Sequence, residues 1–319
     1  MQQNQNNLPR LTFSVISDIH LRSGKDYRGH PYHDKEADFK FANALIDLNH
    51  INQTQNALVI NGDLTVTGTQ SDYDCMNKVL HQTPHPACTL FTIGNHEFYS
   101  AFQDKHGKMN IHSFPNGVTE TQCIHRFLQN TKAPNVYYDK WIQGCHFIML
   151  GSEQSRITDR WNYDNPILSE VQLKWLDTAL KSYPSNQPTF VFLHQPMLYQ
   201  DVGNTNYIIN AAKLHRILKK YPVVFFSGHS HETLHEQTQI IYHDGLIVLI
   251  DSSVRNPVHD YRFPVSDSEG LYVQVYENKV VVKGRDFTHK VWISQLVIPL
   301  PLVDKVCARY PIHKEHSPL

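Results

Sequence analysis

The stretch FFSGHSHET, residues 225–233, combines two features that decide the fold: an apolar run and the histidines that end it. The apolar residues, with Val223 and Val224 before them, predict a buried strand. Gly228 follows the strand, and then come His229 and His231 with one serine between them. A polar loop rich in histidine is the simplest interpretation. Whether these histidines bind a ligand therefore depends on the chemistry at the other strand ends.

Apolar segments rich in β-formers alternate with helical patterns along most of the chain, which is typical of a layered α/β fold. The predicted buried strands are residues 11–17, 57–61, 89–93, 146–150, 189–193 and 223–227. Helices are predicted over residues 36–51, 71–80, 169–182 and 206–221. From residue 240 onward, alternating segments without helices predict antiparallel strands. The long polar segments 98–137, 153–168 and 196–207 are predicted to be loops.

Composition excludes several kinds of partner. The chain has 29 basic and 30 acidic residues and no block of like charge, so neither an extended nucleic acid nor an anionic membrane is expected to bind. A signal peptide and a spanning helix are also not predicted, and the cytoplasm is the expected location. The 5 cysteines form no CxxC pair, which favours a reduced intracellular protein.

Polar residues capable of binding metal follow five of the six predicted buried strands. They are Asp18 and His20, then Asp63, then Asn95 and His96, then His194, and finally His229 and His231. A single such residue is more often a turn or cap residue, but five independent coincidences are hard to sustain. If the segments are extended, residues two apart point to the same side. Gly62, Gly94 and Gly228 are expected to allow close approach to a crowded centre.

The candidate ligands share a chemistry of imidazole, carboxylate and amide groups without thiolates. This set suits divalent ions such as Mn, Fe or Zn rather than a structural cysteine site. Seven candidates are too many for one tetrahedral ion and match two ions that share a carboxylate. The seven are Asp18, His20, Asp63, Asn95, His194, His229 and His231.

In this order, the motifs resemble those of the calcineurin-like dinuclear metallophosphoesterases, over about residues 11–231. The resemblance implies a four-layer α/β/β/α sandwich of two mixed sheets with the metals at the strand ends. It also implies a role for each candidate. Asp18, His20 and His231 hold the first metal, Asp63 bridges both metals, and Asn95, His194 and His229 hold the second. His96 contacts the scissile phosphate and can protonate the leaving oxygen.

Two departures narrow the choice within that family. Asp63 is followed by LTVTG, which lacks the phosphate-gripping arginine of the Ser/Thr protein phosphatases. Purple acid phosphatases have a tyrosine ligand three residues after the bridging aspartate and lack the first histidine, whereas this chain has Val66 and His20. The chain therefore resembles most the bacterial branch that includes class III cyclic-nucleotide and other small-molecule phosphodiesterases.

The expected function is metal-dependent hydrolysis of a phosphodiester in a small organic phosphate or cyclic nucleotide. A hydroxide bridging two metals is expected to attack phosphorus in line, with His96 stabilising charge or donating a proton. Phosphomonoesterase and nuclease activities use the same site and are the alternatives, although the near-zero net charge disfavours a nuclease. A non-catalytic binding module is a third interpretation, but it predicts damaged ligands and all seven are intact.

Other expectations concern the domain limits and the surroundings of the site. Residues 8–290 are predicted to form the metallophosphoesterase domain, and residues 291–319 a C-terminal extension packed on the domain or at an interface. Glu97 is expected either to orient a ligand or to cap a turn. Five residues of the long loops are candidates to contact a leaving group, although surface or packing roles are simpler for each. They are Tyr99, His106, His112, Tyr199 and Tyr207.

Overall fold

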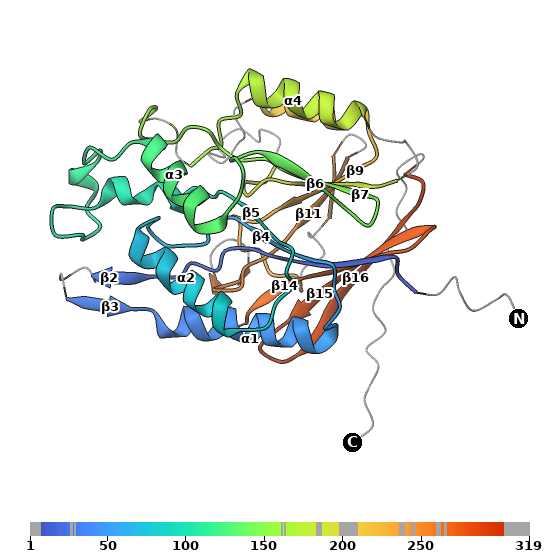
Figure 1. Cartoon of the computed structure of the whole chain (residues 1–319), viewed down its shortest axis with the longest axis horizontal. Coiled ribbons are helices and arrows are strands. Elements are labelled where there is room, and N and C mark those ends of the chain that lie inside the picture. The colour runs from blue at the N-terminus through green and yellow to red at the C-terminus, as the bar shows by residue number, and fades with distance from the viewer. Residues whose placement is uncertain are drawn as a thin grey trace, which may run out of the picture.

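The computed structural model has four layers, in which two β-sheets face each other and helices cover both outer faces (Figure 1). It describes residues 8–25, 28, 30–160, 162, 164–182, 187–197, 210–235, 240–243, 246–259, 263–264 and 267–302. The predicted α/β/β/α sandwich is therefore confirmed. Among the described residues, no helix is long and apolar enough to cross a bilayer.

The first sheet has six strands in the order β16-β15-β14-β1-β4-β5. It is mixed, because β1, β4 and β5 are parallel to one another while β14, β15 and β16 add antiparallel pairs. The bounds are β1 Leu11–Ile16, β4 Ala57–Asn61, β5 Thr89–Thr92, β14 Glu269–Val275, β15 Lys279–Asp286 and β16 Val291–Pro299. The first part of the predicted C-terminal extension thus forms an edge strand of this sheet.

The second sheet also has six strands, in the order β10-β11-β9-β8-β7-β6. Its four inner strands are parallel, and an antiparallel strand closes each edge. The bounds are β6 Tyr138–Ile142, β7 Cys145–Met149, β8 Thr189–Phe192, β9 Val223–Ser227, β10 Ile240–His243 and β11 Leu246–Ile250. Two short hairpins, β2 Ser23–Lys25 with β3 Pro31–His33 and β12 Val258–His259 with β13 Phe263–Pro264, lie outside both sheets.

Apolar side chains fill the three interfaces between the layers. Between the sheets, the ring of Phe13 lies 4.9 Å from the rings of both Phe147 and Phe190. Helices α1 Lys35–Ile51, α2 Gln70–Gln82 and α3 Glu120–Thr131 share a core with the outer face of the first sheet. Helices α4 Glu170–Lys181 and α5 Ala211–Leu218 share another with the second sheet. Large aromatic and β-branched residues on both faces explain why these strands are buried on both sides.

The structure differs from the predicted elements mainly in the segment 98–137. This segment was predicted to be a loop, but it contains most of the 3-10 helix η2 His96–Phe102, the short η3 Ile111–Ser113 and α3. Thr119 and Gln122 form a capping box at the start of α3, a signal that can be read from the sequence. Helix α3 was not predicted because most of its residues are polar, and only Cys123, Phe127 and Thr131 are buried.

Candidate metal centre

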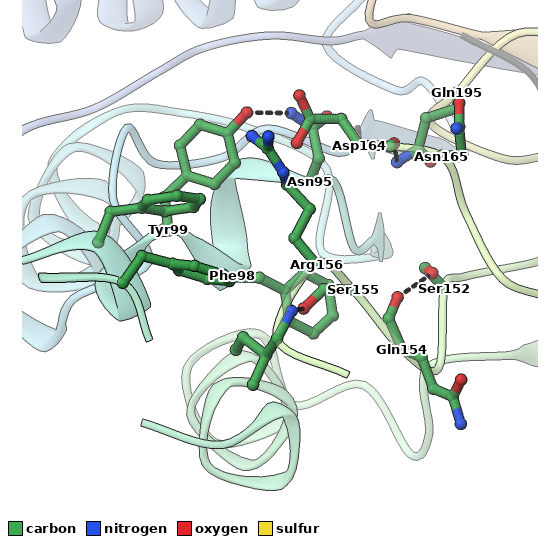
Figure 2. Close-up of a pocket in the computed structure, with 13 residues that line it drawn as sticks. Asn95, Phe98, Tyr99, Ser152, Gln154, Ser155, Arg156, Asp164, Asn165 and Gln195 are labelled. Carbon is green, nitrogen blue, oxygen red and sulfur yellow. Dashed lines mark hydrogen bonds between the residues drawn. The ribbon is translucent and has the colours of Figure 1, made fainter. Parts of the chain in front are cut away.

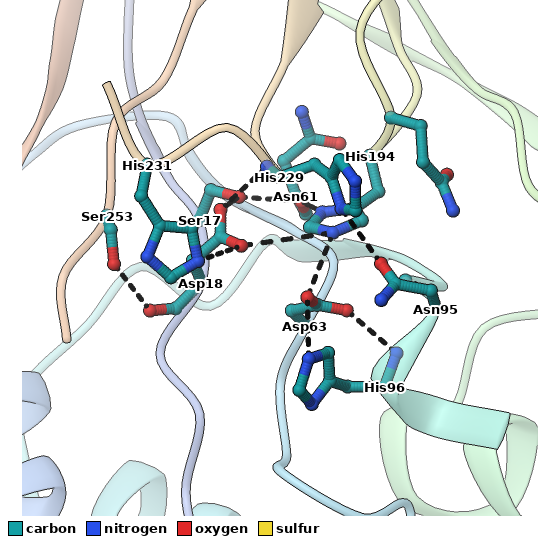
Figure 3. Close-up of polar contacts among 12 residues, drawn as sticks. Ser17, Asp18, Asn61, Asp63, Asn95, His96, His194, His229, His231 and Ser253 are labelled. Carbon is teal, nitrogen blue, oxygen red and sulfur yellow. Dashed lines mark hydrogen bonds and ion pairs between the residues drawn. The ribbon is translucent and has the colours of Figure 1, made fainter. Parts of the chain in front are cut away.

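The described structure brings all seven predicted ligands together where strands of both sheets end (Figure 3). Asp18, His20 and His231 form a first group. His231 Nε2 lies 3.0 Å from Asp18 Oδ1 and 3.1 Å from His20 Nε2, and His20 Nε2 lies 3.6 Å from Asp18 Oδ1. Their ligand atoms are thus close enough to surround one ion.

Asp63, His194, His229 and Asn95 form a second group beside the first. His194 Nε2 lies 3.1 Å from Asp63 Oδ2, and His229 Nδ1 lies 3.0 Å from Asn95 Oδ1. Asp63 also faces the first group, because its Oδ2 lies 3.8 Å from His20 Nε2. Asp63 is therefore the carboxylate placed between the two groups, as the sequence interpretation requires of a bridging ligand.

The backbone reaches this arrangement in a way that the sequence analysis did not predict. Extended segments were expected at the Asp18/His20 and His229/His231 pairs, but five of the seven candidate ligands have left-handed backbones. The φ angles are 54° for Asp18, 45° for His20, 48° for Asp63, 67° for His229 and 58° for His231. The expectation of extended geometry is wrong here. Such strain in non-glycine residues persists only where the surroundings impose it, and it gathers at functional sites.

Three glycines make room for the ligands, as predicted. Gly62 has φ 81°, and a Cβ at this position would lie 2.5 Å from the imidazole of His194. A Cβ at Gly94 would overlap the carboxylate and backbone nitrogen of Asp63. A Cβ at Gly228 would lie 2.6 Å from the carboxylate of Asp18, so a side chain at any of the three positions would displace a candidate ligand.

The donor atoms fit a cation rather than a network of hydrogen bonds. His194 Nδ1 lies 2.8 Å from the carbonyl oxygen of Asn61 and must donate to it, so the lone pair of the neutral ring is on Nε2. That Nε2 is buried and makes no hydrogen bond to any described residue, although the Asp63 carboxylate lies beside it. His231 is oriented in the same way by the carbonyl of Asn256, at 3.0 Å. Both lone pairs point at carboxylates, an arrangement that a positive ion between them would satisfy.

The electrostatics of the site also call for positive charge. Burial would raise the pKa of Asp18 and Asp63, but the surrounding imidazoles outweigh burial and lower both. Burial would lower the pKa of His194, but the carboxylates of Asp63 and Asp18 raise it to about 10. Burial lowers the pKa of His20 and His229 to about 4, so both rings are neutral at physiological pH. Ionised carboxylates and neutral imidazoles are the forms that bind metals, so an ion that binds here replaces the proton that the raised pKa places on His194 Nε2.

A buried polar group that the sequence analysis missed supports the ligands from behind. Asn61 accepts hydrogen bonds at its carbonyl from His194 Nδ1, at 2.8 Å, and from Ser17 Oγ, at 2.9 Å. The side chain of Asn61 is held in turn by Asp251, through an Nδ2–Oδ2 bond of 2.5 Å. Asp251 directly follows β11, so the strand-end pattern that revealed the ligands also marked this residue. Burial raises its pKa well above the ordinary range.

His96 and Glu97 have different roles in the structure. His96 Nδ1 donates to the carbonyl of Val66 at 2.8 Å, which leaves Nε2 facing the site, 3.9 Å from Asp63 Oδ2. Glu97 is fully buried and accepts hydrogen bonds from the backbone nitrogens of Gly94 and Thr65, at 2.8 and 3.1 Å. Glu97 thus holds two ligand loops together, and burial with the nearby Asp63 raises its pKa to about 8.

The candidates for contact with a leaving group are distributed unevenly. Tyr99 lies against His96, with ring centroids 4.2 Å apart, and its hydroxyl accepts a hydrogen bond from Asn95 Nδ2 at 3.1 Å. His106 and His112 are exposed on the surface. Tyr199 and Tyr207 lie outside the described residues.

Residues 11–233 match the family model described as calcineurin-like phosphoesterase. The chain belongs to this family. Calcineurin-like phosphoesterases use two divalent metal ions, and the two adjoining groups of donors described above fit such a pair.

Similar proteins support the family assignment. The chain is 24% identical to a glycerophosphodiester phosphodiesterase, GpdQ, of Enterobacter lignolyticus (strain SCF1), over 76% of this chain and 78% of that protein. It is 22% identical to the human manganese-dependent ADP-ribose/CDP-alcohol diphosphatase, over 86% of this chain and 90% of that protein. Among solved structures, a dimetal phosphatase from Danio rerio has a TM-score of 0.62 and 16% identity, covering 89% of this chain and 99% of that one. The last likeness concerns the fold.

Proposed function

We propose that this calcineurin-like phosphoesterase hydrolyses a phosphodiester or diphosphate bond in a small organic molecule. The observation that carries the proposal is the convergence of seven metal-binding side chains around buried, ionised carboxylates. The two relatives are named for a glycerophosphodiester substrate and for ADP-ribose and CDP-alcohol substrates. In both, the scissile phosphate carries a second substituent, which favours a diester over a monoester here.

We assign the ligands of two divalent ions from the two groups of donors. Asp18, His20 and His231 hold one ion, Asn95, His194 and His229 hold the other, and Asp63 serves both. When bound, such a pair supplies an activated water and neutralises charge on the phosphoryl oxygens. Manganese is the first ion to test, because the human relative is named as manganese-dependent.

His96 is assigned the proton chemistry beside the metal centre. Its Nδ1 is committed to the Val66 carbonyl, so only Nε2 can serve the substrate. In the protonated ring, Nε2 donates to a phosphoryl oxygen or to the departing alkoxide. The backbone nitrogen of His96 donates to Asp63 Oδ1 at 3.0 Å, which fixes the position of this histidine relative to the proposed bridging ligand.

The test measures hydrolysis of bis(p-nitrophenyl) phosphate, p-nitrophenyl phosphate and plasmid DNA after loading with Mn, Zn or Fe. We expect diester turnover that depends on metal, with less monoester turnover and no plasmid nicking. His96→Ala is expected to lower kcat about 100-fold to 10,000-fold without loss of bound metal. The exposed His112 provides the matched control, His112→Ala, which should leave kcat unchanged. No diester turnover with any metal, or a His96→Ala enzyme as active as the control, would overturn the proposal.

A further inference from the structure

A pocket adjoins the candidate metal centre (Figure 2). Asn95 belongs to both, because its Oδ1 faces His229 while the residue lines the pocket. Gln195, next in sequence to His194, also lines the pocket. A group esterified to a phosphate at the metal centre could therefore extend into this space.

One wall of the pocket is aromatic. Phe102 and Phe114 stack with ring centroids 4.3 Å apart, and Tyr99 meets Phe102 edge-on at 5.4 Å. Phe98 from the same 3-10 helix completes this wall. Aromatic walls of this kind favour a flat ring as ligand, because stacking adds to the apolar area that is buried.

The opposite side offers a hydrogen-bond acceptor without a partner. Gln195 is only 4% exposed, and its Nε2 donates to the backbone carbonyl of Asp164 at 3.0 Å. That bond fixes the orientation of the amide, and Oε1 has no hydrogen-bond partner among the described residues. A buried acceptor left unpaired costs stability, so a ligand that donates to Oε1 would relieve this cost. The expected ligand therefore combines a flat ring with an N–H or O–H donor.

Arg156 excludes one other kind of ligand. Its guanidinium lies over the ring of Phe102, with Cζ 5.6 Å from the centroid. A choline headgroup, which would bring a second positive charge beside Arg156, does not match this pocket. An aliphatic chain has no donor for Gln195.

We propose that this pocket binds the nucleobase of a nucleotide ester, with Gln195 Oε1 accepting from an exocyclic amino group. The proposal rests on the proposed function, because it concerns the group attached to the phosphate that the metal centre would cleave. Cytosine and adenine carry such an amino group, whereas uracil and hypoxanthine present a carbonyl oxygen at the same position. The pocket should therefore distinguish cytidine from uridine, and adenosine from inosine.

The first test measures binding of the free nucleosides to the full-length protein by isothermal titration calorimetry. Nucleosides carry no phosphate, so this measurement does not depend on hydrolysis. We expect cytidine and adenosine to bind about tenfold more tightly than uridine and inosine, the equivalent of one hydrogen bond lost. Gln195→Leu should abolish this discrimination. Equal binding of the amino and carbonyl nucleosides, or no binding of any, would overturn the inference.

The second test compares kcat/KM for CDP-glycerol with that for glycerophosphoglycerol. Phe114→Leu removes a stacking ring and should lower the ratio of the two values about 3-fold to 10-fold. Phe39→Leu is the matched control, since Phe39 is exposed on α1, and it should leave the ratio unchanged. An unaltered ratio in Phe114→Leu would count against the pocket.

The two proposals can fail separately. If the enzyme hydrolyses both substrates without preferring the nucleotide, and nucleosides do not bind, the pocket inference fails and the proposed function stands. If nucleosides bind with the expected discrimination but no ester is hydrolysed, the proposed function fails and the pocket assignment stands.

Discussion

Removing the carboxylate of Asp251 should weaken metal binding although this residue touches none of the proposed ions. Asp251 holds the side chain of Asn61, whose carbonyl accepts from both His194 and Ser17. The single hydroxyl proton of Ser17 is shared between this carbonyl and the carboxylate of Asp18, which lies 2.5 Å from Oγ. The pair Asp251 and Asn61 therefore positions one candidate ligand in each group. In Asp251→Ala, the buried amide of Asn61 loses its acceptor and both ligands lose a fixed support.

Two magnitudes follow from this arrangement. An unpaired buried amide costs about 1–3 kcal/mol of unfolding free energy. Loss of a group that orients ligands typically weakens metal affinity about 10-fold to 100-fold, or roughly 1.4–2.7 kcal/mol. Asp251→Asn keeps an acceptor oxygen for Asn61 and should lose less of both quantities.

The assay titrates Mn into metal-free protein and follows the concentration that gives half of the maximal diester turnover, beside urea unfolding. Gln172→Ala is the matched control, because Gln172 is a fully buried amide on α4 that bonds the backbone of Gly151. We expect both alanine variants to lose stability and only Asp251→Ala to need more Mn. The reasoning is refuted if the two variants lose similar stability and the Mn requirement of Asp251→Ala stays at the wild-type value.

Three further outcomes are expected. Asp47→Ala should lower the free energy of unfolding in urea by about 3–5 kcal/mol, because it leaves the buried guanidinium of Arg285 without the carboxylate to which it donates at 2.7 and 3.0 Å. A loss below about 1 kcal/mol would contradict this expectation. Burial raises the pKa of Glu269, so its contribution to stability is present below the ordinary glutamate pKa and is lost as pH rises through the pKa of the folded state. When the free energy of unfolding in urea is measured against pH, Glu269→Gln should make its fall with rising pH less steep. An equally steep fall in the variant would contradict this expectation. Gly94→Ala should lower diester turnover at least about tenfold by displacing Asp63, and wild-type turnover would show that the site tolerates a Cβ there.

Much of the fold could be predicted from hydrophobic periodicity. The predicted strand at residues 57–61 matches β4 and that at 223–227 matches β9, because runs buried on both faces leave a continuous apolar pattern. Helix α3 was missed because a mostly exposed helix has few apolar residues to reveal its period, and only its capping box remained as a signal. Edge strand β6 was missed for a related reason, since three of its five residues are exposed.

The candidate ligands could be predicted because each lies within four residues of the end of a strand, and strand ends at one edge converge whatever the loops between them do. The backbone conformation could not be predicted, since left-handed angles at Asp18 and His231 depend on contacts with distant segments. Arg255, for example, donates its backbone N–H to the carbonyl of Asp18 at 3.1 Å. The pocket was also beyond reach, because its wall joins residues from 95 to 195 that no local pattern connects.

The central claim is that Asp63 serves two metal ions that together cleave a phosphodiester. The most direct measurement counts Mn per chain by elemental analysis, with bis(p-nitrophenyl) phosphate turnover on the same samples, for the wild type and Asp63→Asn. We predict two ions per wild-type chain, fewer than two in Asp63→Asn, and at least a 100-fold loss of turnover in that variant, of the order that two-ion chemistry supplies. A loaded wild-type chain with fewer than two ions, or an Asp63→Asn enzyme that turns over at the wild-type rate, would contradict the claim.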